Sequence, residues 1–356
     1  MGRIGRGVEK GSGIGIKVQH PPEWKCSLLH LHPHLHLHQL SDSPHCVSIM
    51  LLNGSLLLSF ASLVLSAAVP SKLEARAGPY QTRIYESGST FLQEDNGWWQ
   101  LIDATGDGRP DLFYIKNRNT GTGYVEVHIA SSTSNYQTRI LEVPTTFVSE
   151  DNGTWRAIKS ANSALPDLVY IKTRNTPSGY VEVHIASGAS TYRTRTLEVV
   201  TTFANEDDGQ WNVYDYDGDG KPDLVFIKTS NTGTGTDELF VASGASNYQT
   251  RLLSTGTTFA VEDNGFWQLG AYSSTRDLIY IKDRNTGTGT VEVHVASAAS
   301  GYQSRLLDVG STFVQETNGP WSLVDWNKDG VLDLVYIKIK NTGTGTVEVH
   351  VATGKS

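Results

Sequence analysis

The chain has 356 residues, of which 38% are hydrophobic and 19% charged, so it can form one large domain or two smaller ones. Residues 78–356 carry 22 basic and 33 acidic side chains, a net charge of −11 that disfavours binding to nucleic acid or anionic lipid. The only two cysteines are Cys26 and Cys46, so neither disulfides nor cysteine chemistry are expected after residue 49.

Residues 1–49 differ in composition from the rest of the chain. They hold seven of the eleven histidines, mostly in an alternating Leu-His tract from Leu29 to His38. Such a tract can bind metal. We favour the simpler interpretation that residues 1–49 are an unstructured leader, which the natural protein need not contain if its translation starts at Met50.

Residues 50–77 have the pattern of a secretory signal peptide with a short pro-segment. An apolar stretch after Met50 ends in small residues, and cleavage is expected between Ala68 and Ala77. The alternative is a signal anchor, because residues 47–69 are numerous enough to cross a bilayer. The small residues favour cleavage, which predicts a secreted, extracellular protein with no membrane attachment afterwards.

Residues 78–356 contain five copies of one unit. A Tyr-Gln-Thr-Arg motif or a close variant recurs at spacings of 56, 56, 56 and 54 residues, starting at Tyr80, Tyr136, Tyr192, Tyr248 and Tyr302. No copy has helical periodicity, and each offers four short β runs separated by Gly, Asn, Asp and Ser. This pattern predicts an all-β fold, a five-bladed β-propeller with four strands in each blade.

The polarity of the four runs predicts their order within a blade. In the third copy the runs are residues 211–216, 223–228, 237–242 and 248–253, and the second of them is almost entirely apolar. We therefore expect the tryptophan run nearest the axis and the Tyr-Gln-Thr-Arg run at the rim. The last copy lacks its rim strand, so residues 80–85 are expected to complete that blade and close the ring.

Acidic loops follow the first run in the first, third and fifth copies. Oxygen-bearing residues alternate in these loops, and glycine at the sixth position permits a tight turn, as in loops that bind calcium. The predicted Ca²⁺ ligands are Asp103, Thr105, Asp107, Arg109, Asp111, Asp215, Asp217, Asp219, Lys221, Asp223, Asp325, Asn327, Asp329, Val331 and Asp333, with the seventh residue of each loop contributing its carbonyl. The alternative is that these are ordinary Asp-Gly turns. Residues 159–167 and 271–277 of the other two copies have lost the ligands.

These loops, followed by Asp-Leu-Val-Tyr-Ile, resemble the FG-GAP/VCBS repeat family, and residues 215–225 match it best. The resemblance covers all five copies. It implies a β-propeller with calcium in loops on one face, as in integrin-type adhesion proteins and secreted fungal and bacterial proteins. Some fungal members are lectins for N-acetylglucosamine-type sugars, and others are accessory repeats beside a hydrolase.

The face opposite the acidic loops is the predicted ligand face. Planar polar groups beside aromatic rings suit sugar recognition. The candidate ligand-binding residues are Asp95, Asn96, Trp98, Arg118, Asn119, Asp151, Asn152, Trp155, Arg174, Asn175, Asp207, Trp211, Asp263, Asn264, Trp267, Arg284, Asn285, Asn318 and Trp321. For any single one, the alternative of a turn residue or a core tryptophan has the greater weight. Asn152 also begins a glycosylation sequon.

The copies contain no recurring catalytic set, so we expect the protein not to be an enzyme. Four histidines share one position with Phe240, which indicates packing: His128, His184, His294 and His350. The preferred hypothesis is a calcium-stabilised, lectin-like protein whose partners are glycans or glycoproteins. The alternative is a calcium-stabilised adhesion or protein-interaction scaffold without sugar specificity. The sequence names neither the sugar nor the oligomeric state.

Overall fold

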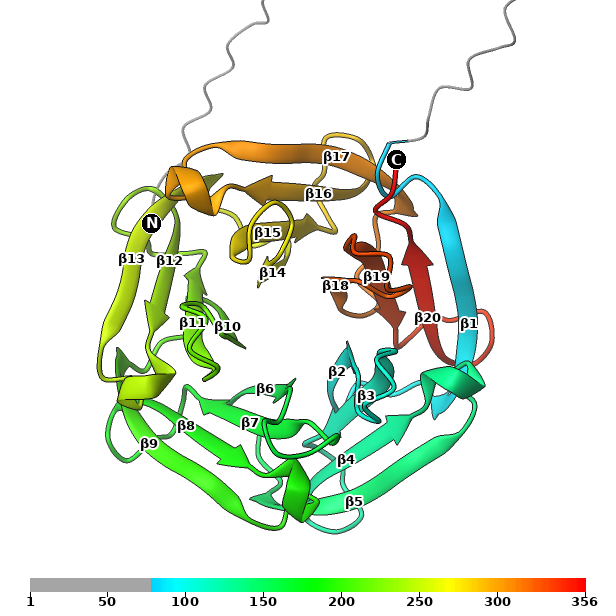
Figure 1. Ribbon diagram of the computed structural model, residues 1–356, viewed down its shortest axis with the longest axis vertical. Helices are drawn as coiled ribbons and strands as arrows, with labels where there is room; N and C mark the ends of the chain where they lie inside the picture. The colour runs from blue at the N-terminus through cyan, green and yellow to red at the C-terminus, as the bar shows by residue number, and fades with distance from the viewer. Residues whose placement is uncertain (1–77) are drawn as a thin grey trace, which may run out of the picture. The chain divides into compact units, whose positions relative to one another are not determined.

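The computed structural model describes residues 78–356, which form a ring of five four-stranded antiparallel sheets (Figure 1). The predicted five-bladed β-propeller is confirmed. The expected leader, the signal peptide or anchor, and both cysteines lie outside the described residues. No helix among residues 78–356 is long and apolar enough to cross a membrane.

Blades one to four each run outward from the axis in chain order (Figure 1). Blade one consists of β2 (Gly97–Ile102), β3 (Asp111–Lys116), β4 (Tyr124–Ala130) and β5 (Arg139–Val148). Blade two consists of β6 (Gly153–Ile158), β7 (Asp167–Lys172), β8 (Tyr180–Ala186) and β9 (Arg195–Ala204). Blade three consists of β10 (Gly209–Tyr214), β11 (Asp223–Lys228), β12 (Thr236–Ala242) and β13 (Arg251–Ala260).

Blade four consists of β14 (Gly265–Gly270), β15 (Asp277–Lys282), β16 (Thr290–Ala296) and β17 (Arg305–Val314). Blade five consists of β18 (Trp321–Val324), β19 (Asp333–Lys338), β20 (Thr346–Ala352) and β1 (Arg83–Leu92). Short 3₁₀ turns precede the outer strands of blades one to four: η1 (Ser132–Ser134), η2 (Gly188–Ser190), η3 (Gly244–Ser246) and η4 (Ala298–Ser300).

The ring closes through strand β1, as predicted. β1 pairs antiparallel with β20 and is the outer strand of blade five. The closure continues before β1, where the N–H of Tyr80 donates to the carbonyl of Thr353 at 2.8 Å. Blade five is therefore built from both ends of the repeat region.

The hydrophobic core lies between the faces of neighbouring sheets. The second strand of each blade is almost wholly buried, which explains its unbroken apolar sequence. In every blade a tryptophan of the inner strand stacks on an aromatic ring of the second strand, with centroids 3.8–4.1 Å apart. A phenylalanine from the preceding blade meets each of these tryptophans edge-on.

The Tyr-Gln-Thr-Arg motif corrects one prediction. Only its arginine begins the outer strand, and its tyrosine has a positive φ and is buried. Gln137 of this motif donates through Nε2 to the carbonyl of Gly88 in the neighbouring blade at 2.6 Å. The arginine stacks on a phenylalanine of the preceding blade at all five joints, with 3.8–4.7 Å to the ring centroid. The motif is thus an inter-blade strap, defined here as these Tyr, Gln and Arg contacts.

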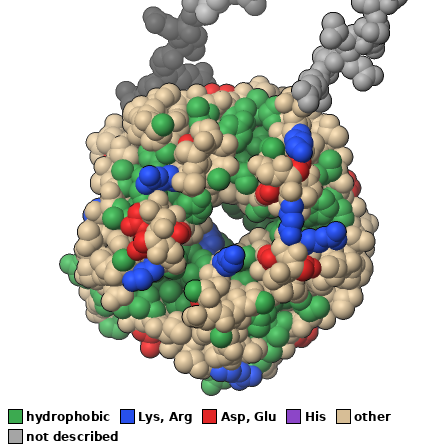
Figure 2. Space-filling model, viewed as in Figure 1, with side chains coloured by type: hydrophobic (Ala, Val, Ile, Leu, Met, Phe, Trp, Pro, Cys, Tyr) green, Lys and Arg blue, Asp and Glu red, His purple; other side chains and the backbone are tan. Residues whose placement is uncertain are grey.

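A channel runs along the axis, and it is visible in the space-filling view (Figure 2). Amide side chains of the inner strands bridge neighbouring blades around it. Gln100 donates to the carbonyl of Ala157 at 2.8 Å and accepts from its N–H at 2.9 Å, and Gln268 bonds to Leu323 in the same way. These amides satisfy backbone groups at strand edges that face the channel.

Candidate functional site

The acidic loops and the 3₁₀ turns share one end of the propeller. The ninth loop residue of each acidic loop, Asp111, Asp223 or Asp333, is fully buried. Its Oδ1 accepts the backbone N–H of the loop after the third strand, at 2.7–3.0 Å. Asp167 and Asp277 do the same in blades two and four, which have lost the other acidic residues. This aspartate therefore joins two loops in every blade, and it is not a metal signature by itself.

Blade three has the most complete carboxylate cluster. Oxygen atoms of Asp215, Asp217 and Asp223 lie within 4.8 Å of one another, a geometry that suits a hard cation. Burial raises the pKa of Asp223, and the charge of Asp217 adds to this effect. Asp219 and Lys221 of the same loop are exposed. Acidic side chains gather over β10 and β11, at the left of Figure 2.

Blade five keeps part of the same arrangement. Asp325 accepts the N–H groups of Asp329 and Gly330 at 3.0 Å each, so the loop is wrapped around this carboxylate. Asn327 accepts the N–H of Asp329, and the N–H of Val331 donates to the Asp329 carboxylate. Lys355 pairs with this carboxylate at 3.0 Å, so the predicted ligand Asp329 already has a cationic partner. Among the described residues, buried Oδ2 of Asp333 has no hydrogen-bond partner. A cation bound by this loop would supply that missing partner.

Blade one fits a cation less well. Asp103 accepts the N–H groups of Gly106 and Gly108 at 2.8 Å each, and Thr105 is exposed. The ammonium group of Lys328, from blade five, donates to the carbonyl of Asp107 at 3.0 Å. An ammonium group already lies against this loop, so a metal ion is less favoured here.

Blade four shows what replaces the other acidic residues. Asp277 Oδ2 accepts the N–H and hydroxyl of Ser273 at 2.7 and 2.9 Å, and Ser274 adds two more bonds to this carboxylate. Burial opposes ionisation of Asp277, but the donors outweigh it, and its pKa lies below the usual value. Hydrogen bonds alone thus satisfy the buried charge in this blade.

Four candidate tryptophans on the opposite end are not available to a ligand. Trp155, Trp211, Trp267 and Trp321 are at most 3% exposed and belong to the stacked core. The prediction that they bind a ligand is corrected in favour of core packing. Blade one differs because Trp99 fills the core position and the preceding residue, Trp98, is half-buried.

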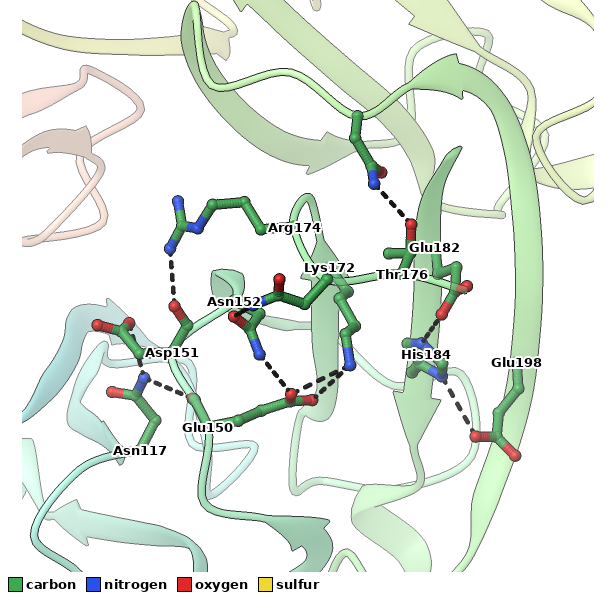
Figure 3. Close-up of polar contacts among 12 residues, drawn as sticks. Asn117, Glu150, Asp151, Asn152, Lys172, Arg174, Thr176, Glu182, His184 and Glu198 are labelled. Carbon is green, nitrogen blue, oxygen red and sulfur yellow. Dashed lines mark hydrogen bonds and ion pairs between the residues drawn. The ribbon is translucent and has the colours of Figure 1, made fainter. Parts of the chain in front are cut away.

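Most polar candidates on this end bond to one another, as Figure 3 shows for blade two. Asn175 donates to the side-chain oxygen of Asn152 at 2.6 Å, and Asn152 donates to Glu150 at 2.8 Å. Lys172 also holds Glu150, at 3.1 Å. The same amide pair recurs in blades one, four and five as Asn119–Asn96, Asn285–Asn264 and Asn341–Asn318. These asparagines primarily hold the loops together, and glycosylation of Asn152 stays a prediction.

Two of the arginines clamp neighbouring loops. Arg118 pairs with Asp151 at 3.0 Å and donates to the carbonyl of Asp95 at 2.6 Å. Arg174 makes the equivalent contacts with Asp207 at 3.0 Å and with the carbonyl of Asp151 at 2.7 Å. Because these pairs are exposed, each contributes roughly 1 kcal/mol or less to stability.

Several of the candidate residues also line two cavities at the axial opening. One cavity of about 360 Å³ is lined by Trp98, Phe266, Asp95, Arg118 and Arg284, among others. A second cavity of about 340 Å³ is also lined by Trp98 and Phe266, and it adds Asp207 and Asp263. The two half-buried rings therefore lie between rims of carboxylate and guanidinium groups.

Sequence reasoning missed Phe266 and Arg156 in this opening. Phe266 occupies the inner-strand position held by Trp98 in blade one and by Thr154 in blade two. Arg156 lies 5.0 Å from the Trp98 ring centroid and donates to Asn212 at 2.7 Å. Aligning the copies position by position reveals both, because these inner-strand positions vary between the copies.

No family model matches the sequence. No curated protein matches it either. Among solved structures, the catalytic domain of a Coprinopsis cinerea GH62 α-L-arabinofuranosidase has a TM-score of 0.49 and 11% identity, covering 78% of this chain and 99% of that one. A candidate glycoside hydrolase from Parabacteroides distasonis has a TM-score of 0.41 and 13% identity, covering 80% and 95%. BBS1N in complex with ARL6DN has a TM-score of 0.38 and 10% identity, covering 78% and 98%.

The prediction that the chain is not an enzyme is contradicted by this comparison. Two of these similar structures are a catalytic domain and a candidate hydrolase. The prediction is therefore withdrawn. With TM-scores below 0.5 and identities of 11% and 13%, these similarities assign neither an activity, a substrate nor catalytic residues to this chain.

Proposed function

We propose that this propeller binds carbohydrate at the axial opening, on the end that carries Asp95 and Arg118. The observation that supports this is the placement of Trp98 and Phe266, two half-buried aromatic rings lining both adjoining cavities. A sugar stacks its apolar face on such rings, and its hydroxyls bond to carboxylate and guanidinium groups. Asp95, Asp207, Asp263, Arg118 and Arg284 provide these groups.

A glycan array followed by calorimetry tests the proposal. The variants Trp98→Thr and Phe266→Thr insert the residue that blade two has at this position. We expect each to weaken binding of a recognised glycan at least tenfold, because a stacking surface is lost. The control, Ile140→Thr, alters an exposed apolar side chain on outer strand β5, away from both cavities, and should leave affinity within twofold.

The same preparations should be checked for release of reducing sugar, which would reveal hydrolysis. A protein that binds no glycan on the array would refute the proposal. So would binding that survives both aromatic substitutions with unchanged affinity.

We also propose that Ca²⁺ stabilises blades three and five. Asp215, Asp217 and Asp223 would hold the ion in blade three, and Asp325 and Asp333 in blade five. A bound ion would supply positive charge to carboxylates that face one another. The support is the close carboxylate geometry of blade three and the buried, unpartnered oxygen of Asp333.

The test is thermal denaturation with calcium and with a chelator. We expect calcium to raise Tm and the chelator to reverse the increase. Asp217→Asn should reduce the calcium-dependent increase, whereas Asp151→Asn, on the other end of the ring, should leave it unchanged. A Tm that ignores both calcium and chelator would refute this proposal.

A protein-interaction scaffold is the second candidate function. Large apolar side chains are exposed at the ends of the outer strands on the ligand face, including Leu92 at 72%, Val148 at 64% and Val314 at 67%. These three lie on three different blades, so a partner would have to contact several blades at once. Replacing these three by serine should abolish capture of a protein partner while leaving glycan binding intact.

We further propose that the chain is a secreted member of the FG-GAP/VCBS group, because its acidic loops keep that motif in three blades. Expressing the full chain and sequencing the N-terminus of protein in the medium tests secretion. We expect a terminus between Ala68 and Ala77. Retention of all protein in the cell would contradict this proposal.

A further inference from the structure

Another cavity, separate from the two at the axial opening, lies on the acidic-loop end at the joint of blades five and one. It has a volume of about 330 Å³ and is lined by Arg109, Pro110, Ser132, Asn135, Trp326, Asn327 and Lys328. The axial opening is on the other end of the ring, so this cavity forms no part of the carbohydrate site proposed above.

The indole of Trp326 forms an apolar wall of this cavity. Its Nε1 donates to the hydroxyl of Tyr136 at 2.9 Å, and Tyr85 packs against the ring with centroids 4.7 Å apart. The ring is therefore fixed in orientation, and it remains half-exposed. A fixed aromatic surface of this kind can receive a planar or apolar ligand face without loss of side-chain entropy.

The lining of the cavity contains cations and no carboxylate. Arg109 and Lys328 are exposed, and the Lys328 ammonium also donates to the carbonyl of Asp107, whose carboxylate lies on the same loop just outside the lining. Four other cavities in residues 78–356 each include at least one acidic residue in their lining. A cationic cavity is unexpected in a region with net charge −11.

A hydroxyl completes the polar lining. The Oγ of Ser132 is buried and has no hydrogen-bond partner within the described part of the chain. The other blades have Gly188, Gly244, Ala298 and Gly354 at this position, so only blade one offers a hydroxyl here. A buried hydroxyl without a partner favours a ligand that can hydrogen-bond to it.

Two lining residues from different blades depart from the repeat pattern. Lys328 of blade five replaces the glycine of blades one and three, and Ser132 of blade one replaces the glycine or alanine of the other four blades. Trp326 is the largest side chain at a position that holds Ala104, Ser160, Tyr216 and Tyr272 in the other loops. Because these departures are far apart in the sequence but meet in one cavity, a shared ligand explains them better than independent drift.

We propose that this cavity binds an acidic sugar, a pyranose ring that carries a carboxylate. The ring stacks on Trp326, the carboxylate pairs with Arg109 and Lys328, and a hydroxyl bonds to Ser132. Guanidinium and ammonium groups together give a carboxylate both a bidentate partner and a point charge. A sugar without the carboxylate lacks both interactions and binds more weakly.

Calorimetric titration with sodium D-glucuronate tests the proposal, with D-glucose and inorganic phosphate as comparison probes. We expect glucuronate to bind at least tenfold more tightly than either probe, with an affinity that falls as salt increases. The double variant Arg109→Gln/Lys328→Gln should lose at least tenfold in affinity. Lys221→Gln changes the residue equivalent to Arg109 in blade three and should have no effect.

This experiment distinguishes a failure of the present proposal from a failure of the proposed carbohydrate site at the axial opening. Trp98→Thr should leave glucuronate binding unchanged, whether or not the axial opening binds a glycan. Absence of glucuronate binding would overturn the proposal, as would phosphate binding of equal strength, or binding that the double variant retains. A thermal melt of the double variant within about 2–3 °C of the parent shows that any loss of binding is not due to unfolding.

Discussion

Asp237 in strand β12 carries a prediction about stability and pH. Its side chain is fully buried, neither carboxyl oxygen has a hydrogen-bond partner in residues 78–356, and the other four blades have a buried valine there: Val125, Val181, Val291 and Val347. Burial, together with the charges of Glu262 and Asp263, raises the pKa of Asp237 from 3.8 to about 8. Asp237→Val should therefore stabilise the protein, and by more at pH 8 than at pH 5.

The sign follows from proton binding. Between pH 4 and pH 8 the folded state keeps a proton on Asp237 that the unfolded state releases, so the free energy of unfolding falls as the pH rises through this range. Each pH unit between the unfolded and the folded pKa of Asp237 lowers the free energy of unfolding by about 1.4 kcal/mol. At pH 8 the total loss is therefore on the order of 5 kcal/mol as an upper limit, and local relaxation around the carboxylate reduces it. We expect the gain from Asp237→Val to be roughly 2–3 kcal/mol larger at pH 8 than at pH 5.

Urea denaturation of the parent, Asp237→Val and Asp237→Asn at both pH values measures this effect. Asp237→Asn removes the titration but keeps a polar group in the core, so it should flatten the pH dependence without the full gain. A parent protein whose unfolding free energy does not fall between pH 5 and pH 8 relative to Asp237→Val would refute the reasoning.

Three further predictions concern the packing of the blades. Deleting residues 78–88 should lower Tm by more than 10 °C, because it removes half of the closing strand; an unchanged Tm in differential scanning calorimetry would contradict closure through β1. Trp155→Ala should cost about 3–5 kcal/mol in urea denaturation, since the ring is fully buried and stacked; a loss below 1 kcal/mol would restore a surface role. Gln137→Ala should lower the free energy of unfolding by about 1 kcal/mol, because it removes the hydrogen bond to Gly88 in the neighbouring blade. Arg193→Ala, at the equivalent exposed position of blade two, should leave the free energy of unfolding unchanged.

The repeated positions were the predictable part of this protein. The apolar run of residues 223–228 is a strand with the predicted bounds, because burial on both faces leaves an unbroken apolar sequence. The first run of the third copy begins at Gly209, two residues before the predicted start. A local sequence pattern thus predicts that a segment is a strand more reliably than it predicts the residue at which the strand begins.

Features that depend on a neighbouring blade could not be predicted from the local sequence. Tyr-Gln-Thr-Arg alternates in a way typical of a strand, yet three of its residues form a turn whose contacts lie on a chain segment about 50 residues earlier. Likewise, whether a tryptophan faces a ligand or the core depends on the facing sheet, and this separates Trp98 from Trp155.

The candidate ligand-binding residues predicted from the sequence were chosen mainly at positions that all five copies share. In the structure most of these shared positions hold the loops together or pack in the core. The residues that shape the proposed ligand cavities, among them Phe266, Arg156 and Trp326, lie at positions that vary between the copies. Within a repeat protein, the variable positions are therefore the better guide to binding.

The inter-blade strap has a consequence for how the ring comes apart. An open array of repeats frays from its terminal units, because each end unit has only one neighbour. Here every blade is strapped on both sides, since the arginine contact occurs at all five joints. Losing any blade breaks two joints at once, so no blade is an end from which unfolding can spread at low cost. The ring should therefore melt in a single cooperative transition, even though it is assembled from five similar modules.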